Sequence, residues 1–154
     1  PTAEFFGLDA SDEMLKTAED NIKRADFDGR FKMAQGLAQS FDPADLFGMS
    51  DQARFDKFTF SYALSIIPEW KESLDHALTM LPSGGELHIV DFSGQEGLPQ
   101  WFRALLFWWL KMFHVYHKPE IESYLVTLEE RGEGRLHLEP LYKGYAYYAV
   151  FTKA

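Results

Sequence analysis

The chain has 154 residues, of which 46% are hydrophobic and 16% aromatic, so it is long and apolar enough for one packed domain and is not a disordered tail. It has no cysteine, which excludes disulfides, thiolate metal sites and cysteine nucleophiles. The net charge of −9 argues against a nucleic-acid partner, because a phosphate binder needs a cationic surface.

No signal sequence is recognised, and no apolar run reaches the roughly 20 residues that a membrane span needs. We therefore expect a cytoplasmic protein. No repeat, low-complexity segment or linker divides the sequence, so we expect a single domain over residues 1–154.

The first part of the chain alternates short apolar strands with helices. The expected strands are residues 3–8, 31–35, 55–62 and 86–92, and the expected helices begin at Ser11, Pro43 and Pro68. Met14, Ala18 and Ile22 recur at helical spacing and are expected to face the sheet. Strands that alternate with helices in this way are typical of βαβ units and a mostly parallel sheet.

The pattern changes after Phe92. We expect a loop over 93–99, a helix over 101–116 that is apolar almost all round, and a further helix from Pro119. An aromatic helical insertion is thus expected at about 97–119, a run that has no acidic residue but contains Arg103, Lys111 and Lys118. Residues 135–141 and 145–152 alternate like strands and predict a closing antiparallel hairpin.

Asp9 stands at the end of the first apolar strand, two residues before the helix N-cap Ser11. A carboxylate at this place in a parallel α/β sheet can accept hydrogen bonds from both ribose hydroxyls of a nucleotide-type cofactor. The alternative is an acid that merely favours the helix N-terminus. A strand and a glycine-rich turn normally precede such an acid, so we expect the sequence to be a fragment that lacks them.

Three segments together resemble class I S-adenosylmethionine-dependent methyltransferases. Residues 7–15, GLDASDEML, resemble the post-I motif, residues 55–62 look like the fourth strand, and residues 81–87 look like the turn into the fifth strand. The closing hairpin is similar to the antiparallel sixth and seventh strands. The resemblance implies S-adenosylmethionine as cofactor and an α/β, Rossmann-like methyltransferase sheet. That sheet is mostly parallel with a C-terminal antiparallel hairpin, and its first strand and glycine-rich loop are missing here.

Residues 60–70, FSYALSIIPEW, and residues 90–92, VDF, resemble a narrower group, the bacterial betaine-lipid and phosphatidylethanolamine N-methyltransferases. This likeness implies methyl transfer to the amine of a lipid head group. The aromatic segment after Phe92 and the tyrosine-rich last strand are similar to that group as well.

The resemblance assigns the adenine of the cofactor to two places. Met14 would form an apolar wall against it, although a methionine at helical spacing is also a common core residue. Ala38 and Gln39 would contact it through a backbone amide and a side-chain amide, or would form an ordinary loop. Leu37 stands where the family usually has an acidic residue.

The acceptor side is predicted from strand ends, because ligands bind at the carboxyl ends of parallel strands. Ser61 and Tyr62 end one strand and are predicted to contact the methionine part of the cofactor or the substrate; the Tyr62 hydroxyl can orient a nucleophile. Asp91 ends the next strand and is predicted to pair with a cationic head group. The alternatives are a packing tyrosine and a loop-capping acid.

The aromatic segment supplies further candidates. His114 is a candidate base for the amine proton, and Trp101, Arg103 and Tyr116 are candidate substrate contacts. Aromatic rings with basic edges suit a bilayer headgroup boundary, so peripheral membrane contact is expected. A buried lid helix, a dimer face and structural histidines are the alternatives. Methyl transfer needs no metal, and we expect none.

Two other functions stay open from the sequence. A nicotinamide-dependent dehydrogenase also places an acid after its second strand, although the closing hairpin and the turn at residues 82–85 argue against it. A non-catalytic interaction or membrane-association module that kept the fold is the second alternative.

Overall fold

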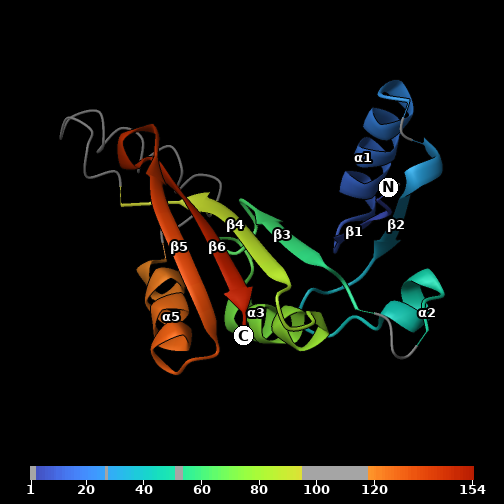
Figure 1. Ribbon diagram of the computed structural model, residues 1–154. Coiled ribbons are helices and arrows are strands. Elements are labelled where there is room, and N and C mark those ends of the chain that lie inside the picture. The colour runs from blue at the N-terminus through green and yellow to red at the C-terminus, as the bar shows by residue number, and fades with distance from the viewer. Residues whose placement is uncertain (1–2, 27, 51–53, 95–117) are drawn as a thin grey trace. The chain divides into compact units, whose positions relative to one another are not determined.

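The computed structural model describes residues 3–26, 28–50, 54–94 and 118–154. The chain folds as two compact units, Pro1–Ala53 and Arg54–Ala154, which are described in turn (Figure 1). Among the helices in the described ranges, none has both the length and the apolar character to cross a membrane.

The first unit is a strand–helix–strand arrangement followed by a short helix. Its elements are β1 (Phe5–Asp9), α1 (Asp12–Arg24), the 3-10 turn η1 (Asp28–Arg30), β2 (Phe31–Gln35) and α2 (Pro43–Phe47). β1 and β2 are parallel, in a register that pairs Phe5 with Phe31 and Asp9 with Gln35. Their carboxyl ends, where the first predicted site residues lie, therefore meet at one edge.

α1 begins as the sequence predicts, because the Ser11 hydroxyl accepts a hydrogen bond from the Met14 amide at 3.4 Å. The expectation that Met14 faces the sheet is wrong, because its side chain is 57% exposed. Leu15 is buried in its place, and Ala18 and Ile22 are half-buried. The inward stripe thus runs through positions i, i+3 and i+7 from Leu15, and Met14 lies about 100° round the helix from it.

β1, which the sequence predicts as an apolar strand, is only half-buried. Phe5 is 41% exposed, and among the described strands β1 pairs with β2 alone, in a two-stranded sheet. The Phe5 ring stacks on Phe31 with 4.7 Å between the ring centroids. The lack of a side chain at Gly7 leaves room for the Met33 side chain of the neighbouring strand, since a Cβ at position 7 would lie 2.3 Å from the Met33 sulfur.

The second unit is a mixed sheet with helices. Its elements are β3 (Lys57–Ser61), α3 (Trp70–Met80), β4 (Glu86–Phe92), α5 (Pro119–Glu130), β5 (Gly134–Leu141), the 3-10 turn η2 (Tyr142–Gly144) and β6 (Ala146–Lys153). The strand order is β3-β4-β6-β5; β3 and β4 are parallel, and β6 is antiparallel to β4 and to β5. The predicted closing hairpin is confirmed. The helix predicted from Pro68 begins at Trp70.

One face of this sheet carries the hydrophobic core. α3 and α5 pack on it (Figure 1). The buried residues are Leu74 and Ala77 of α3, Ile121, Leu125 and Leu128 of α5, Leu87 and Ile89 of β4, and Tyr147, Ala149 and Phe151 of β6, with Leu64 and Leu81 from loops. Burial of these side chains is the main stabilising contribution to the unit.

The opposite face carries a polar network beside apolar side chains such as Val90 and Val150, because side chains alternate along each strand. The carboxylate of Glu86 contacts the Lys57 ammonium at 2.5 Å and the His88 ring at 2.9 Å. The other ring nitrogen of His88 lies 2.7 Å from the Tyr148 hydroxyl. The Lys57 hydrogen bond, and next the His88 hydrogen bond, lower the pKa of Glu86 below its usual value.

The core of α5 gives a first prediction. Leu125→Ala should lower the free energy of unfolding by about 2–5 kcal/mol, because it opens a cavity at a fully buried position. Val126→Ala, its neighbour on the same helix and 40% exposed, should change stability by less than about 0.5 kcal/mol. Urea unfolding measures both, and equal effects would contradict the assigned core face.

The polar network gives a second prediction. Lys57→Met should raise the pKa of Glu86 toward 4.5, with the His88 hydrogen bond still holding it lower. A carboxyl pKa that is lower in the folded than in the unfolded protein stabilises the fold at pH values above the unfolded pKa, and this stabilisation is lost as the pH falls. The variant lacks part of this stabilisation and should therefore lose less stability on acidification. Carboxyl NMR titration measures the pKa. Lys16→Met, which breaks the Asp12 pair on α1, is the control and should leave Glu86 unchanged.

Candidate functional site

The predicted site residues that the structure describes follow strand ends in both units. In the first unit they are Asp9, Met14, Ala38 and Gln39, and in the second Ser61, Tyr62 and Asp91. The candidates Trp101, Arg103, His114 and Tyr116, and the aromatic helix expected over 101–116, lie outside the described residues. Within the described ranges, no group of three or more His, Asp or Glu side chains is placed to hold a metal ion.

Asp9 is fixed by main-chain contacts at the edge where β1 and β2 end. One carboxylate oxygen accepts a hydrogen bond from the Ser11 amide at 2.8 Å. The Asp9 carbonyl accepts from the Gly36 amide at 3.1 Å, and the Gln35 side chain donates to the Ala10 carbonyl at 2.9 Å. The loops after β1 and β2 are thereby tied together. The second carboxylate oxygen of Asp9 makes no hydrogen bond with the described part of the chain.

The loop after β2 closes into a turn beside Asp9. Its ends are joined by hydrogen bonds from the amides of Ser40 and Phe41 to the Leu37 carbonyl, at 3.1 and 3.0 Å. The amides of Ala38 and Gln39, inside the turn, donate to no acceptor among the described residues. Leu37 projects into solvent. The first unit therefore offers unused donors, an unused carboxylate oxygen and exposed apolar side chains, which fits the ribose and adenine of a nucleoside.

Tyr62, the residue directly after β3, has a strained backbone. Its φ is +52°, in the left-handed region that side chains other than glycine rarely adopt, and its amide donates to the Val90 carbonyl at 2.7 Å. Its ring lies 4.9 Å from Phe92, and Phe92 meets Tyr145 edge-on at 5.6 Å. Burial, with Tyr145, raises the pKa of Tyr62, so the hydroxyl stays protonated at neutral pH. It can orient a nucleophile by hydrogen bonding but is not a base there.

Asp91, near the end of β4, is bonded to the segment that follows Tyr62. Its side chain is 1% exposed, and its two oxygens accept hydrogen bonds from the amides of Phe92 at 2.8 Å and Ser65 at 2.9 Å. The structure thus gives the carboxylate a main-chain anchoring role. Ser61, in contrast, is exposed at the end of β3.

Lys118 is a residue to which the sequence assigns no role. Its ammonium donates to the carbonyls of Leu64 at 3.1 Å and Ile67 at 2.7 Å. Burial lowers its pKa, and the charge of Asp91 opposes that shift. The sequence shows only that Lys118 is a lysine in an acid-free run directly before a helix. This pattern does not indicate a hydrogen-bond partner about 50 residues away in sequence.

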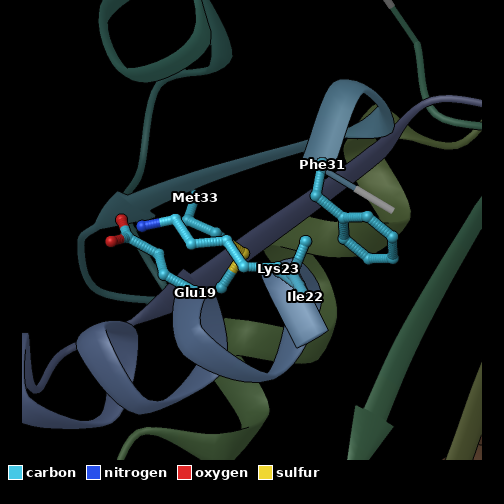
Figure 2. A pocket seen from close by; sticks show the side chains of 5 residues that line it. All are labelled: Glu19, Ile22, Lys23, Phe31 and Met33. Carbon is cyan, nitrogen blue, oxygen red and sulfur yellow. The ribbon is translucent and has the colours of Figure 1, made fainter. Parts of the chain in front are cut away.

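Two hollows of the structure lie away from these residues. One, of ≈ 280 Å³, is lined by Glu19, Ile22, Lys23, Phe31 and Met33; Figure 2 shows the charged ends of Glu19 and Lys23 at the same end of it. The other, of ≈ 240 Å³, is lined by Leu78, Glu133, Phe151, Lys153 and Ala154. They lie toward the amino ends of β2 and β4, and no predicted site residue lines either.

Comparison with known proteins identifies the chain's family. Residues 1–129 match a family described as a methyltransferase domain. The chain belongs to this family. Methyltransferases of this family use S-adenosylmethionine as methyl donor, so the cofactor class expected from the sequence is the one the family uses.

Individual proteins resemble the chain in sequence or in fold. It is 27% identical over 124 residues to a demethylmenaquinone methyltransferase of Listeria welshimeri, covering 80% of this chain and 49% of the relative. A possible exported protein from Bordetella parapertussis has a TM-score of 0.70 at 15% identity, over 99% of this chain and 54% of that one. An O-methyltransferase family protein from Burkholderia thailandensis has a TM-score of 0.66 at 16% identity, over 99% and 44%.

These likenesses confirm the α/β methyltransferase fold predicted from the sequence. The chain spans about half the length of the curated relatives that it matches. The narrower likeness to lipid-amine enzymes is not supported by these relatives, which carry the name demethylmenaquinone methyltransferase.

The backbone of Tyr62 gives a third prediction. Tyr62→Gly should be more stable than Tyr62→Ala by about 1 kcal/mol, because both lose the ring and only alanine keeps the left-handed strain. At exposed Thr59 in β3 the order should reverse, with Ala above Gly by about 0.5–1 kcal/mol. Denaturant unfolding of the four variants measures both differences, and the same order at both positions would contradict a strained Tyr62.

Proposed function

We propose that the protein containing this chain transfers a methyl group from S-adenosylmethionine to a small-molecule nucleophile. The observation that carries the proposal is the edge of the first unit, where Asp9 keeps an unused carboxylate oxygen beside the turn with the unused amides of Ala38 and Gln39. That donor and acceptor set suits an adenosine, and the family is one of methyltransferases.

Each described residue then has a defined task. The free oxygen of Asp9 accepts a hydrogen bond from a ribose hydroxyl, and the backbone amides of Ala38 and Gln39 donate to the adenine. Met14 and Leu37, both exposed, supply apolar contact to the base. When bound, S-adenosylmethionine supplies a sulfonium methyl group for an in-line displacement. The protein's part is mainly alignment and exclusion of water.

We propose the amine of a lipid head group as the first candidate acceptor. The support is the resemblance of residues 60–70 to lipid-amine methyltransferases and the position of Tyr62 at the carboxyl end of β3. Tyr62, protonated at neutral pH, would orient the amine through its hydroxyl, since the raised pKa makes it a poor base. The roles of His114 as base and of Trp101, Arg103 and Tyr116 as substrate contacts belong to the same proposal, as does contact of the aromatic segment with a membrane surface.

Demethylmenaquinone is the second candidate acceptor. The specific observation in its favour is the name of the relatives that share 27% identity with this chain over 124 residues. Tyr62, Phe92 and Tyr145 form an aromatic cluster at the strand ends, which suits a planar ring as well as an alkyl amine.

Asp9 gives a fourth prediction. Asp9→Ala and Asp9→Asn should each weaken binding of radiolabelled S-adenosylmethionine about tenfold or more, because a hydrogen bond to a charged group is lost. Asp9→Asn retains an oxygen for the Ser11 amide, so its effect is not one of misfolding. Asp20→Ala on α1 is the control and should bind as the unaltered protein does. Equilibrium dialysis of the full protein measures this, and unchanged affinity in both Asp9 variants would overturn the donor site.

The acceptor and the alternatives need separate arms of the experiment. Incorporation of labelled methyl into phosphatidylethanolamine vesicles supports the first acceptor, and incorporation into detergent-dispersed demethylmenaquinone replaces it with the second. Binding of NAD in place of S-adenosylmethionine would favour a dehydrogenase. Binding of neither would favour a non-catalytic module.

A further inference from the structure

The segment from Ala63 to Ile67 forms a single helical turn directly after Tyr62. The amides of Ile66 and Ile67 both donate to the Ala63 carbonyl at 3.0 Å. One turn cannot hold itself in water, since few bonds are formed for the dihedral angles that are fixed. Leu64 and Ser65 are buried, so the turn is held by the body of the unit.

Two oppositely charged side chains hold this turn by its main chain. Asp91 accepts the amide hydrogen of Ser65 at 2.9 Å, and Lys118 donates to the carbonyls of Leu64 and Ile67. The acid therefore meets a free N–H of the turn and the lysine meets free carbonyls, which is the arrangement that complements the dipole of a helical turn. No ion pair joins Asp91 and Lys118 directly within the described residues. Each of them is bonded to the turn instead.

The same contacts constrain Tyr62. A non-glycine residue at φ +52° persists only where its surroundings over-determine it. The Tyr62 amide is bonded to Val90, three residues later the Ser65 amide is bonded to Asp91, and the end of the turn is bonded to Lys118. Strand β4 thus fixes the Tyr62 amide itself, and β4 and the start of α5 together fix the turn that follows this strained residue.

We propose that Asp91 and Lys118 are positioning residues that grip the turn 63–67 and thereby keep Tyr62 in its left-handed conformation, with its ring against Phe92. Their effect on the methyl acceptor rests on the proposed function. Their effect on the Tyr62 backbone does not, so the two parts can fail separately.

The structural test compares two lysines that make the same kind of contact. Lys153 donates to the carbonyls of Leu78 and Leu81 at 2.8 and 2.9 Å, so Lys153→Met loses as many hydrogen bonds as Lys118→Met in the same unit. In ¹⁵N-labelled protein, Lys118→Met and Asp91→Ala should speed hydrogen exchange of the Ser65 amide about tenfold or more and change the HN–Hα coupling of Tyr62. Lys153→Met should change neither, and Lys118→Arg, which keeps the donors, should restore both.

A merely structural lysine gives a different result. If Lys118 only anchors the start of α5, Lys118→Met will speed exchange in α5 and leave the Ser65 exchange and the Tyr62 coupling as they are. That outcome, or equal changes in Lys118→Met and Lys153→Met, overturns the proposal.

The kinetic arm uses the full protein with the acceptor that takes up labelled methyl, either phosphatidylethanolamine in vesicles or detergent-dispersed demethylmenaquinone. Lys118→Met should raise KM for the acceptor or lower kcat about tenfold while the dissociation constant of S-adenosylmethionine stays within about twofold. A loss of donor affinity equal to the loss of activity contradicts an acceptor-side role. If the unaltered protein binds no S-adenosylmethionine, the proposed function fails, and the NMR comparison still decides whether the grip on Tyr62 exists.

Discussion

The hydrogen bonds of the buried Asp91 carboxylate are the contacts on which the candidate binding site for the methyl acceptor depends. Asp91 lies near the end of β4, and its carboxylate accepts hydrogen bonds from the Ser65 amide in the turn after β3 and from the Phe92 amide of β4 itself. A buried charge is costly unless it is hydrogen-bonded, and here two amides and the nearby Lys118 compensate for it. β4 therefore positions the loop of its neighbour β3 as well as its own, and Tyr62 is held where the two strands end.

The sheet of the second unit has two different faces because β4 and β6 alternate. Leu87, Ile89 and Phe151 point to the helices, while Glu86 and His88 form a polar network on the other side. The helices thus stabilise the unit from one face. The candidate site lies at the carboxyl ends of the strands, and this is where ligands bind in open α/β sheets.

Much of the secondary structure follows from local patterns. The strands at 31–35 and 86–92 have the expected bounds, and the closing hairpin follows from alternation around a turn. Met14 shows where this reasoning fails, because Met14 and Leu15 are both apolar and adjacent, and periodicity alone did not select the buried one. The amphipathic stripe of a helix is wide, and which side of it is buried depends on the strands against which it packs.

For the described residues, the sequence by itself determined the order of strands and helices, and it gave the Asp9 motif and the family resemblance, because these depend on neighbours in the chain. Only the tertiary structure decided what Asp91 and Lys118 do. Their partners, Ser65, Leu64 and Ile67, are 26 to 54 residues away, and no local pattern links them. The left-handed backbone of Tyr62 was also hidden, since a tyrosine adopts it only when distant contacts over-determine the conformation.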